Sequence, residues 1–167
     1  MTMDIQLARI GSRLLPSQVA SEWVKQTLPN RILMVSNRVA QDPLRQTLVL
    51  QSAPRGIEAN VLTIKKMLAI YQDPEFDAYQ PLLLTENAKD MAKLVKGGID
   101  LQKIGINLGI LVFQDGMEML TDGVAVNQSE AKALSYLTDV AHLKVVIQEK
   151  PTDKPEDIKP FLDQLTF

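Results

Sequence analysis

The sequence predicts an α/β protein with a single open, mainly parallel twisted sheet and helices on both faces. Apolar runs of strand length alternate with segments whose apolar residues recur at helical spacing, which is typical of βα units. The 167 residues are 46% hydrophobic, enough for one domain with a sizeable core. The sequence contains no internal repeat, low-complexity run or linker, so we expect one domain over residues 1–167.

The first strand is expected at residues 5–10, an apolar run at the start of the chain. A helix over residues 17–27 follows, because its apolar residues, including Trp23, recur on one face. Pro29 ends this helix. Residues 31–36 then form a short apolar run that predicts a buried strand.

The second helix is expected to begin at the Asp42-Pro43 pair, because proline suits the first turn of a helix. Residues 59–62 form a short strand. Thr63 is a typical N-cap for the next helix, which continues to Tyr71.

The central strand is expected at residues 80–85. Asn87 can cap a helix over residues 88–96, and the glycine pair at 97–98 ends it. Residues 104–108 form the next strand.

The last third of the chain begins with two short edge or hairpin strands, at residues 117–120 and 124–126. We then expect a helix over residues 128–141, a strand over 143–148 and a closing helix over 155–165.

The charge balance excludes one class of partner. Lysine and arginine number 18 and aspartate and glutamate number 20, so the formal net charge is −2. Nucleic acid is therefore not an expected partner, since phosphate neutralisation needs clustered basic residues. The absence of cysteine removes disulfides, thiolate catalysis and cysteine-based metal sites, and we expect no metal and no cofactor. No secretory signal or membrane-spanning apolar run is present, which favours an intracellular location.

Four common catalytic motifs are also missing, namely the P-loop, GxGxxG, HExxH and GxSxG patterns. His142, the only imidazole, stands just before the strand expected at 143–148. We interpret it as a capping or surface residue rather than a catalytic one, because it lies at an amino end of the sheet. Ligands of open α/β sheets bind at the carboxyl ends of the strands. The loops to search are therefore residues 11–17, 37–42, 85–87 and 109–115.

The first of these loops is the most informative. Residues 9–19 read R-I-G-S-R-L-L-P-S-Q-V and lead into a helix whose free N–H groups favour an anion. Arg13 can add a forked phosphate contact. An ordinary salt bridge from Arg13 to an acidic neighbour is an equally good interpretation.

This loop resembles one family. It is similar to the R-I-D-x-R-L-I-H-G-Q-V loop of the IIB component of the mannose/fructose/sorbose class of bacterial phosphoenolpyruvate-dependent sugar phosphotransferase systems. Four further segments match in order: 36–42 (family N-D-x-V-A-x-D), 94–98 (L-V-x-G-G), 106–107 (the start of I-N-V-G) and 151–153 (P-T-D). The resemblance covers residues 4–165 and implies the same α/β sheet.

The departures from this family affect its catalytic loop. The resemblance implies that the histidine of H-G-Q-V takes a phosphoryl group from IIA and passes it to the sugar. That position is Pro16 here, and proline has no nucleophilic nitrogen. Four other family residues are replaced in this chain. Gly11 replaces the loop aspartate, Ser17 replaces the glycine after the histidine, and Asn37 replaces the aspartate of N-D. Asp122 replaces the basic residue that the family often has before its A-V-S-V strand.

The sequence therefore predicts a sugar-specific IIB-like component that has lost catalysis and acts by protein docking or regulation. No catalytic residue is assigned. The expected anion- or partner-binding residues are Arg13, Leu14, Leu15, Ser17 and Gln18. Packing of the two leucines under the helix is the alternative to an interface.

Two rival functions stay open, an active sugar phosphotransferase with a non-standard acceptor and an α/β module that binds an anion or a sugar phosphate. The partners that the resemblance implies are a IIA-type phosphocarrier and a membrane IIC/IID sugar permease. It also implies a cytoplasmic location, peripheral to the inner membrane through the permease, and homo-oligomerisation is left open.

Overall fold

The computed structural model describes residues 2–12 and 17–167, with the side chains of residues 17–20 left aside. Within these residues, strands assemble into a seven-stranded sheet in the order β3-β2-β4-β1-β5-β8-β9. Adjacent strands are parallel except for the edge pair β8 and β9. Their bounds are β1 Leu7–Ile10, β2 Arg31–Val35, β3 Glu58–Leu62, β4 Pro81–Thr85, β5 Ile106–Leu108, β8 Val145–Ile147 and β9 Glu156–Asp157. The predicted open, mainly parallel sheet is confirmed.

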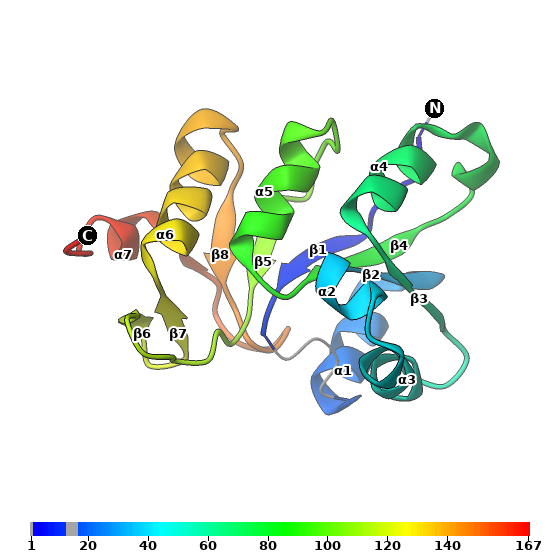
Figure 1. Cartoon of the computed structure of the whole chain (residues 1–167), viewed down its shortest axis with the longest axis horizontal. Helices are drawn as coiled ribbons and strands as arrows, with labels where there is room; N and C mark the ends of the chain where they lie inside the picture. The colour runs from blue at the N-terminus through cyan, green and yellow to red at the C-terminus, as the bar shows by residue number, and fades with distance from the viewer. Residues whose placement is uncertain (1, 13–16) are drawn as a thin grey trace.

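Helices cover both faces of this sheet (Figure 1). Helices α4, α5 and α6 lie side by side on one face, and α1, α2 and α3 lie on the other. The bounds are α1 Ser17–Thr27, α2 Asn37–Ala40, α3 Pro43–Gln51, α4 Ile64–Gln72, the 3₁₀ turn η1 Pro74–Phe76, α5 Ala88–Lys96, α6 Gln128–Ser135, the π-helical segment η2 Tyr136–Val140 and α7 Lys159–Leu162.

The core follows from the alternation of side chains along buried strands. In β2, Leu33 and Val35 face the α4–α6 side, whereas Ile32 and Met34 pack toward Trp23 of α1. All five are buried. Both faces of this strand are therefore covered, which is why its sequence is continuously apolar.

The predicted helix caps form as expected. The side chains of Asp42, Thr63 and Asn87 accept from the backbone N–H groups of Arg45, Lys66 and Asp90 respectively. Each satisfies a donor that the first turn of a helix leaves free.

Of the two alternatives left open for residues 117–126, edge strands or a hairpin, the structure shows a hairpin, which lies outside the main sheet. It joins β6 Glu118–Thr121 to the antiparallel β7 Val124–Val126. The main chain of Leu111, in the loop after β5, pairs with Val124, so the hairpin lies beside the carboxyl end of β5.

Three expectations differ from the structure. The prediction of a closing helix over 155–165 is wrong: β9 pairs antiparallel with β8, and helix begins only at Lys159. Pro160 has no N–H and is tolerated only in the first turn of a helix, so it disfavours a helix that begins at residue 155 and suits one that begins at Lys159. The predicted helix 128–141 ends in the π-helical turn η2, and the short helix α2 was not expected.

Candidate functional site

The candidate site lies at the carboxyl end of β1, a central strand with β4 on one side and β5 on the other. The connection after β1 leads to α1 on one face, and the connection after β4 leads to α5 on the other (Figure 1). Open α/β sheets bind ligands at such a position. The N–H of Gly11 donates to the carbonyl of Thr85, and the N–H of Ser12 to that of Ile110, each at 3.0 Å. The first loop therefore begins at this edge, as expected.

The predicted binding residues are not brought into any described contact. Arg13, Leu14, Leu15 and Pro16 lie outside the described residues. The other two, at positions 17 and 18, begin α1, and their side chains also lie outside the description. The roles assigned to these residues stay predictions.

Ser12 ties the first loop to the loop after β5. Its hydroxyl donates to the carbonyl of Ile110 (3.2 Å) and accepts from the N–H of Val112 (3.0 Å). The neighbouring Val112 and Phe113 side chains are 45% and 52% exposed. Two exposed apolar residues thus belong to the loop that Ser12 ties to the first loop.

Arg9 organises the same edge from inside the sheet. This buried β1 residue donates to the side-chain oxygen of Asn107 and to the carbonyls of Gln148 (2.9 Å) and Glu149 (3.0 Å). Its guanidinium also lies 3.6 Å from the Glu149 carboxylate and 5.3 Å from the centre of the Trp23 ring. One side chain therefore connects β1, β5, α1 and the segment after β8.

The network continues into the turn after β8. The amide of Asn107 donates to the side-chain oxygen of Gln148 (3.1 Å), whose own amide donates to the carbonyls of Pro151 (3.3 Å) and Asp153 (2.9 Å). Three of the sequence segments that carried the resemblance thus meet in one network. The sequence pattern predicts no role for Arg9, and the available signal is a charged residue inside an otherwise apolar strand.

Burial and the neighbouring charge shift the pKa of Arg9 in opposite directions. Burial lowers its pKa to about 10, and the Glu149 carboxylate opposes this shift. The guanidinium is therefore still protonated at neutral pH. Gly109 leaves room for it, because a Cβ at that position would contact the guanidinium. Gly109, Gln148 and Glu149 also line a pocket of about 350 Å³.

Ser12 and Glu86 line a second pocket, of about 450 Å³. The Glu86 carboxylate accepts from the Ser36 hydroxyl (3.0 Å) and, with both oxygens, from Arg38 (3.2 and 2.6 Å). Arg45 approaches it at 3.9 Å. The hydrogen bond and charge of Glu86 raise the pKa of Arg38.

Glu130 also lines this pocket. It is a buried carboxylate from the first turn of α6, and it accepts from the N–H of Ala88, the first residue of α5, at 2.6 Å. Burial raises the pKa of Glu130, against the opposing effects of the Ala88 hydrogen bond and the Lys89 charge. The sequence did not point to it, because an acid in a first helical turn is ordinary.

Three further residues that the sequence singled out are Asn37, Asp122 and His142, and the structure places none of them in the networks of Arg9 or Glu86. The side-chain oxygen of Asn37 accepts from the N–H of Ile64 (2.9 Å) and so holds the start of α4. Asp122 is exposed in the turn between β6 and β7. His142 is exposed, has φ 56° and ends the helical segment before β8, at the amino edge of the sheet. The interpretation of His142 as a surface residue at that edge is confirmed.

No helix among the described residues is long and apolar enough to cross a membrane.

Comparison with known proteins agrees with this architecture. Residues 5–167 match the family described as the sorbose-subfamily IIB component of the phosphotransferase system. The fructose-specific EIIB component of Bacillus subtilis is 31% identical over 98% of this chain and 99% of its own. The mannose-specific EIIAB component of Escherichia coli K12 is 34% identical over 90% of this chain, which spans 46% of that protein. The IIB domain of the Klebsiella pneumoniae sorbose permease superposes with a TM-score of 0.92 at 28% identity, over 99% of both chains. The chain therefore belongs to the sorbose-subfamily IIB components of the phosphotransferase system.

Proposed function

We propose that this chain is a single-domain IIB component, residues 1–167, that docks to other components of a sugar phosphotransferase system without carrying the phosphoryl group itself. Its partners in this proposal are a IIA-type phosphocarrier and a membrane IIC/IID permease, which would hold it at the cytoplasmic face of the membrane. The observation that supports the loss of catalysis is the proline at position 16, where the resembling loop has its phosphoryl-accepting histidine.

The single histidine of the chain does not offer a substitute. Gly11 and Ser12 follow the carboxyl end of β1, and His142 precedes the amino end of β8. Because β1, β5 and β8 are parallel, these positions lie at opposite edges of the sheet. A partner seated at the first loop would not reach this imidazole.

The two serines described at the carboxyl edge are also poor acceptors. The Ser12 hydroxyl donates to the Ile110 carbonyl, and Ser36 is 1% exposed and donates to Glu86. A serine nucleophile needs both access and a base. A phosphoserine ester is moreover too stable to pass its group to a sugar hydroxyl.

We expect no acid-labile phosphoryl group on this chain when phosphoenolpyruvate, the general phosphotransferase proteins and a IIA-type protein of the same class are supplied. The measurement is radiolabel transfer, resolved by protein and by acid lability. The matched positive control is a family member with histidine at the position of Pro16. Stoichiometric acid-labile label on His142, or on any other residue, would overturn the proposal.

The docking half of the proposal is supported by the exposed apolar pair Val112 and Phe113, which we call the loop-5 pair. It is tied to the first loop through Ser12. Exposed apolar groups that adjoin a cleft are typical of interface cores, and aromatic residues are enriched among binding hot spots. Leu14 and Leu15, which the sequence predicts as partner-binding residues, belong to the same first loop as Ser12.

Replacing Phe113 with Asp is expected to weaken binding to the IIA-type or permease partner by about tenfold or more, because losing a hot-spot anchor costs about 2 kcal/mol or more and about 1.4 kcal/mol is already tenfold. The matched control is Leu28→Asp, because Leu28 is 74% exposed at the end of α1, on the amino edge. Titration of each folded variant against the purified partner measures the effect.

A second variant, Leu15→Asp with Arg13→Ala, tests the first loop itself in the same titration. Unchanged binding by this variant and by Phe113→Asp would remove the carboxyl edge from the interface. Absence of binding by the parent chain would contradict docking altogether.

A further inference from the structure

We infer that the pocket of about 450 Å³ beside Ser12, which we call the basic pocket, binds a small phosphate monoester that carries hydroxyl groups. Three cationic side chains line it, Arg38, Arg45 and Lys89, together with the carboxylates of Glu86 and Glu130. This inference is independent of whether the chain carries a phosphoryl group or docks to a partner.

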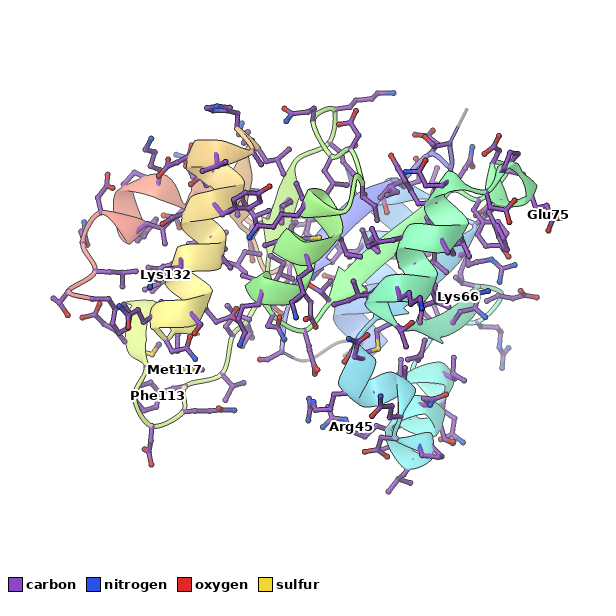
Figure 2. All side chains as sticks on the ribbon, turned by 45° about the horizontal axis from the view of Figure 1, so that its top comes forward. Arg45, Lys66, Glu75, Phe113, Met117 and Lys132 are labelled. Atoms are coloured by element: carbon purple, nitrogen blue, oxygen red, sulfur yellow. The ribbon has the colours of Figure 1, made fainter. Side chains whose placement is uncertain are left out.

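The cations converge from three separate helices. Arg38 comes from α2, Arg45 from α3 and Lys89 from the first turn of α5. Figure 2 shows Arg45 and Met117, another lining residue, at the same edge of the molecule. Against the carboxylates of Glu86 and Glu130, these three cations leave the lining with a formal charge of +1, in a chain whose overall formal charge is −2. Such a surface attracts anions.

The two carboxylates are already occupied by neighbours of their own. Glu130 accepts from the backbone of Ala88 and is itself buried. Glu86 has a 10% exposed side chain and accepts from Ser36 and from two nitrogens of Arg38. These carboxylates therefore already accept hydrogen bonds from donors of the protein itself.

The cations, in contrast, keep donors for a ligand. Arg38 uses Nε and Nη2 on Glu86, which leaves Nη1, and its side chain is 62% exposed. Arg45 meets Glu86 only at 3.9 Å and is 40% exposed, so its guanidinium donors stay available. Glu86 thus holds the Nε–Nη2 edge of the Arg38 guanidinium in place, and Nη1 remains for a ligand in the pocket. A positioned guanidinium binds phosphate oxygens with less loss of side-chain entropy than a free one.

The remaining lining suits hydroxyl groups rather than a bare ion. Gln114 and Asn127 line the pocket, along with the aliphatic Leu111 and Ala125, and Asn127 uses its side-chain oxygen to cap α6, which leaves its NH₂ group as a donor. A volume of about 450 Å³ lies in the range of small-molecule sites. Inorganic phosphate would leave much of this space empty, whereas a hydroxylated ester fills it.

The test is calorimetric titration of the full chain with glucose 6-phosphate, inorganic phosphate and glucose. Glucose 6-phosphate is expected to bind, inorganic phosphate to bind more weakly and to compete with it, and glucose not to bind. The Arg45→Gln, Lys89→Gln double variant should weaken glucose 6-phosphate binding by about tenfold or more, since charge-assisted hydrogen bonds are the strong contacts to phosphate. Arg38 is left intact because it holds Glu86.

The matched control is Lys66→Gln, which removes an exposed cation from α4, away from the pocket (Figure 2). It is expected to leave binding unchanged. No binding of either phosphate compound at about 5 mM, a level that still detects millimolar affinity, would overturn the inference. Equal loss of binding in the control and the double variant would overturn the assignment to this pocket. Equal affinity for phosphate and the ester would overturn the recognition of hydroxyl groups.

Discussion

Replacing Arg9 with Met is expected to lower the free energy of unfolding by about 3 kcal/mol, the largest effect we predict for a single side chain. Methionine keeps the apolar stem beside Trp23 but removes every donor. The side-chain oxygen of Asn107 and the carbonyls of Gln148 and Glu149 would then lose their partner. The Glu149 side chain is 29% exposed, although the oxygen that faces Arg9 is buried, so water screens only part of the lost ion pair. Urea unfolding followed by circular dichroism measures the change.

Gly109 provides a second variant that distinguishes this network from general core damage. In Gly109→Ala, the added Cβ would contact the Arg9 guanidinium, so the guanidinium must move and the protein is destabilised. Gly123→Ala is the matched control, because its Cβ would meet only Ile110, at 3.9 Å. In the Arg9→Met background, Gly109→Ala should cost less than in the parent. Equal costs in both backgrounds would show that Gly109 does not act through Arg9.

Replacing Glu130 with Ala is expected to lower the free energy of unfolding by about 2 kcal/mol, because the N–H of Ala88 loses its acceptor in a buried place. This residue joins the start of α6 to the start of α5. Glu75→Ala, which changes an exposed carboxylate on the 3₁₀ turn (Figure 2), is the control and should have little effect. Denaturant unfolding of the two variants measures the difference, and equal values would contradict the capping role.

The raised pKa of Glu130 also makes part of the stability depend on pH. Its folded pKa lies above the ordinary value of 4.5, because burial disfavours the charged form. A raised folded pKa gives a contribution that is fully present below 4.5 and is lost as pH rises through the folded pKa. Glu130→Gln does not titrate, so its stability relative to the parent should increase with pH across that window. A difference that is constant or decreases with pH would contradict this assignment.

Local sequence determined most of the helix and strand pattern. Helix α1 begins and ends where its apolar spacing and Pro29 predict, and Asp42, Thr63 and Asn87 cap the helices that follow them. These features depend on residues within one or two turns, so they can be read without tertiary structure. The same is true of family membership, which five ordered segments indicate together, and of the proline at the expected acceptor position.

Tertiary structure decided that the segment after β8 forms a strand before its short helix, and it decided which side chains meet. Residues 156–157 form an edge strand because β8 offers an unpaired edge, and no local pattern contains that fact. The Arg9–Asn107 hydrogen bond joins residues 98 apart, and the Arg9–Gln148 bond joins residues 139 apart. Parallel pairing brings the carboxyl ends of β1, β5 and β8 to one edge, and only this alignment makes their polar residues neighbours. Glu130 likewise reaches Ala88 only because α5 and α6 pack side by side on one face of the sheet, so the sequence alone contained the residues of the site but not their partners.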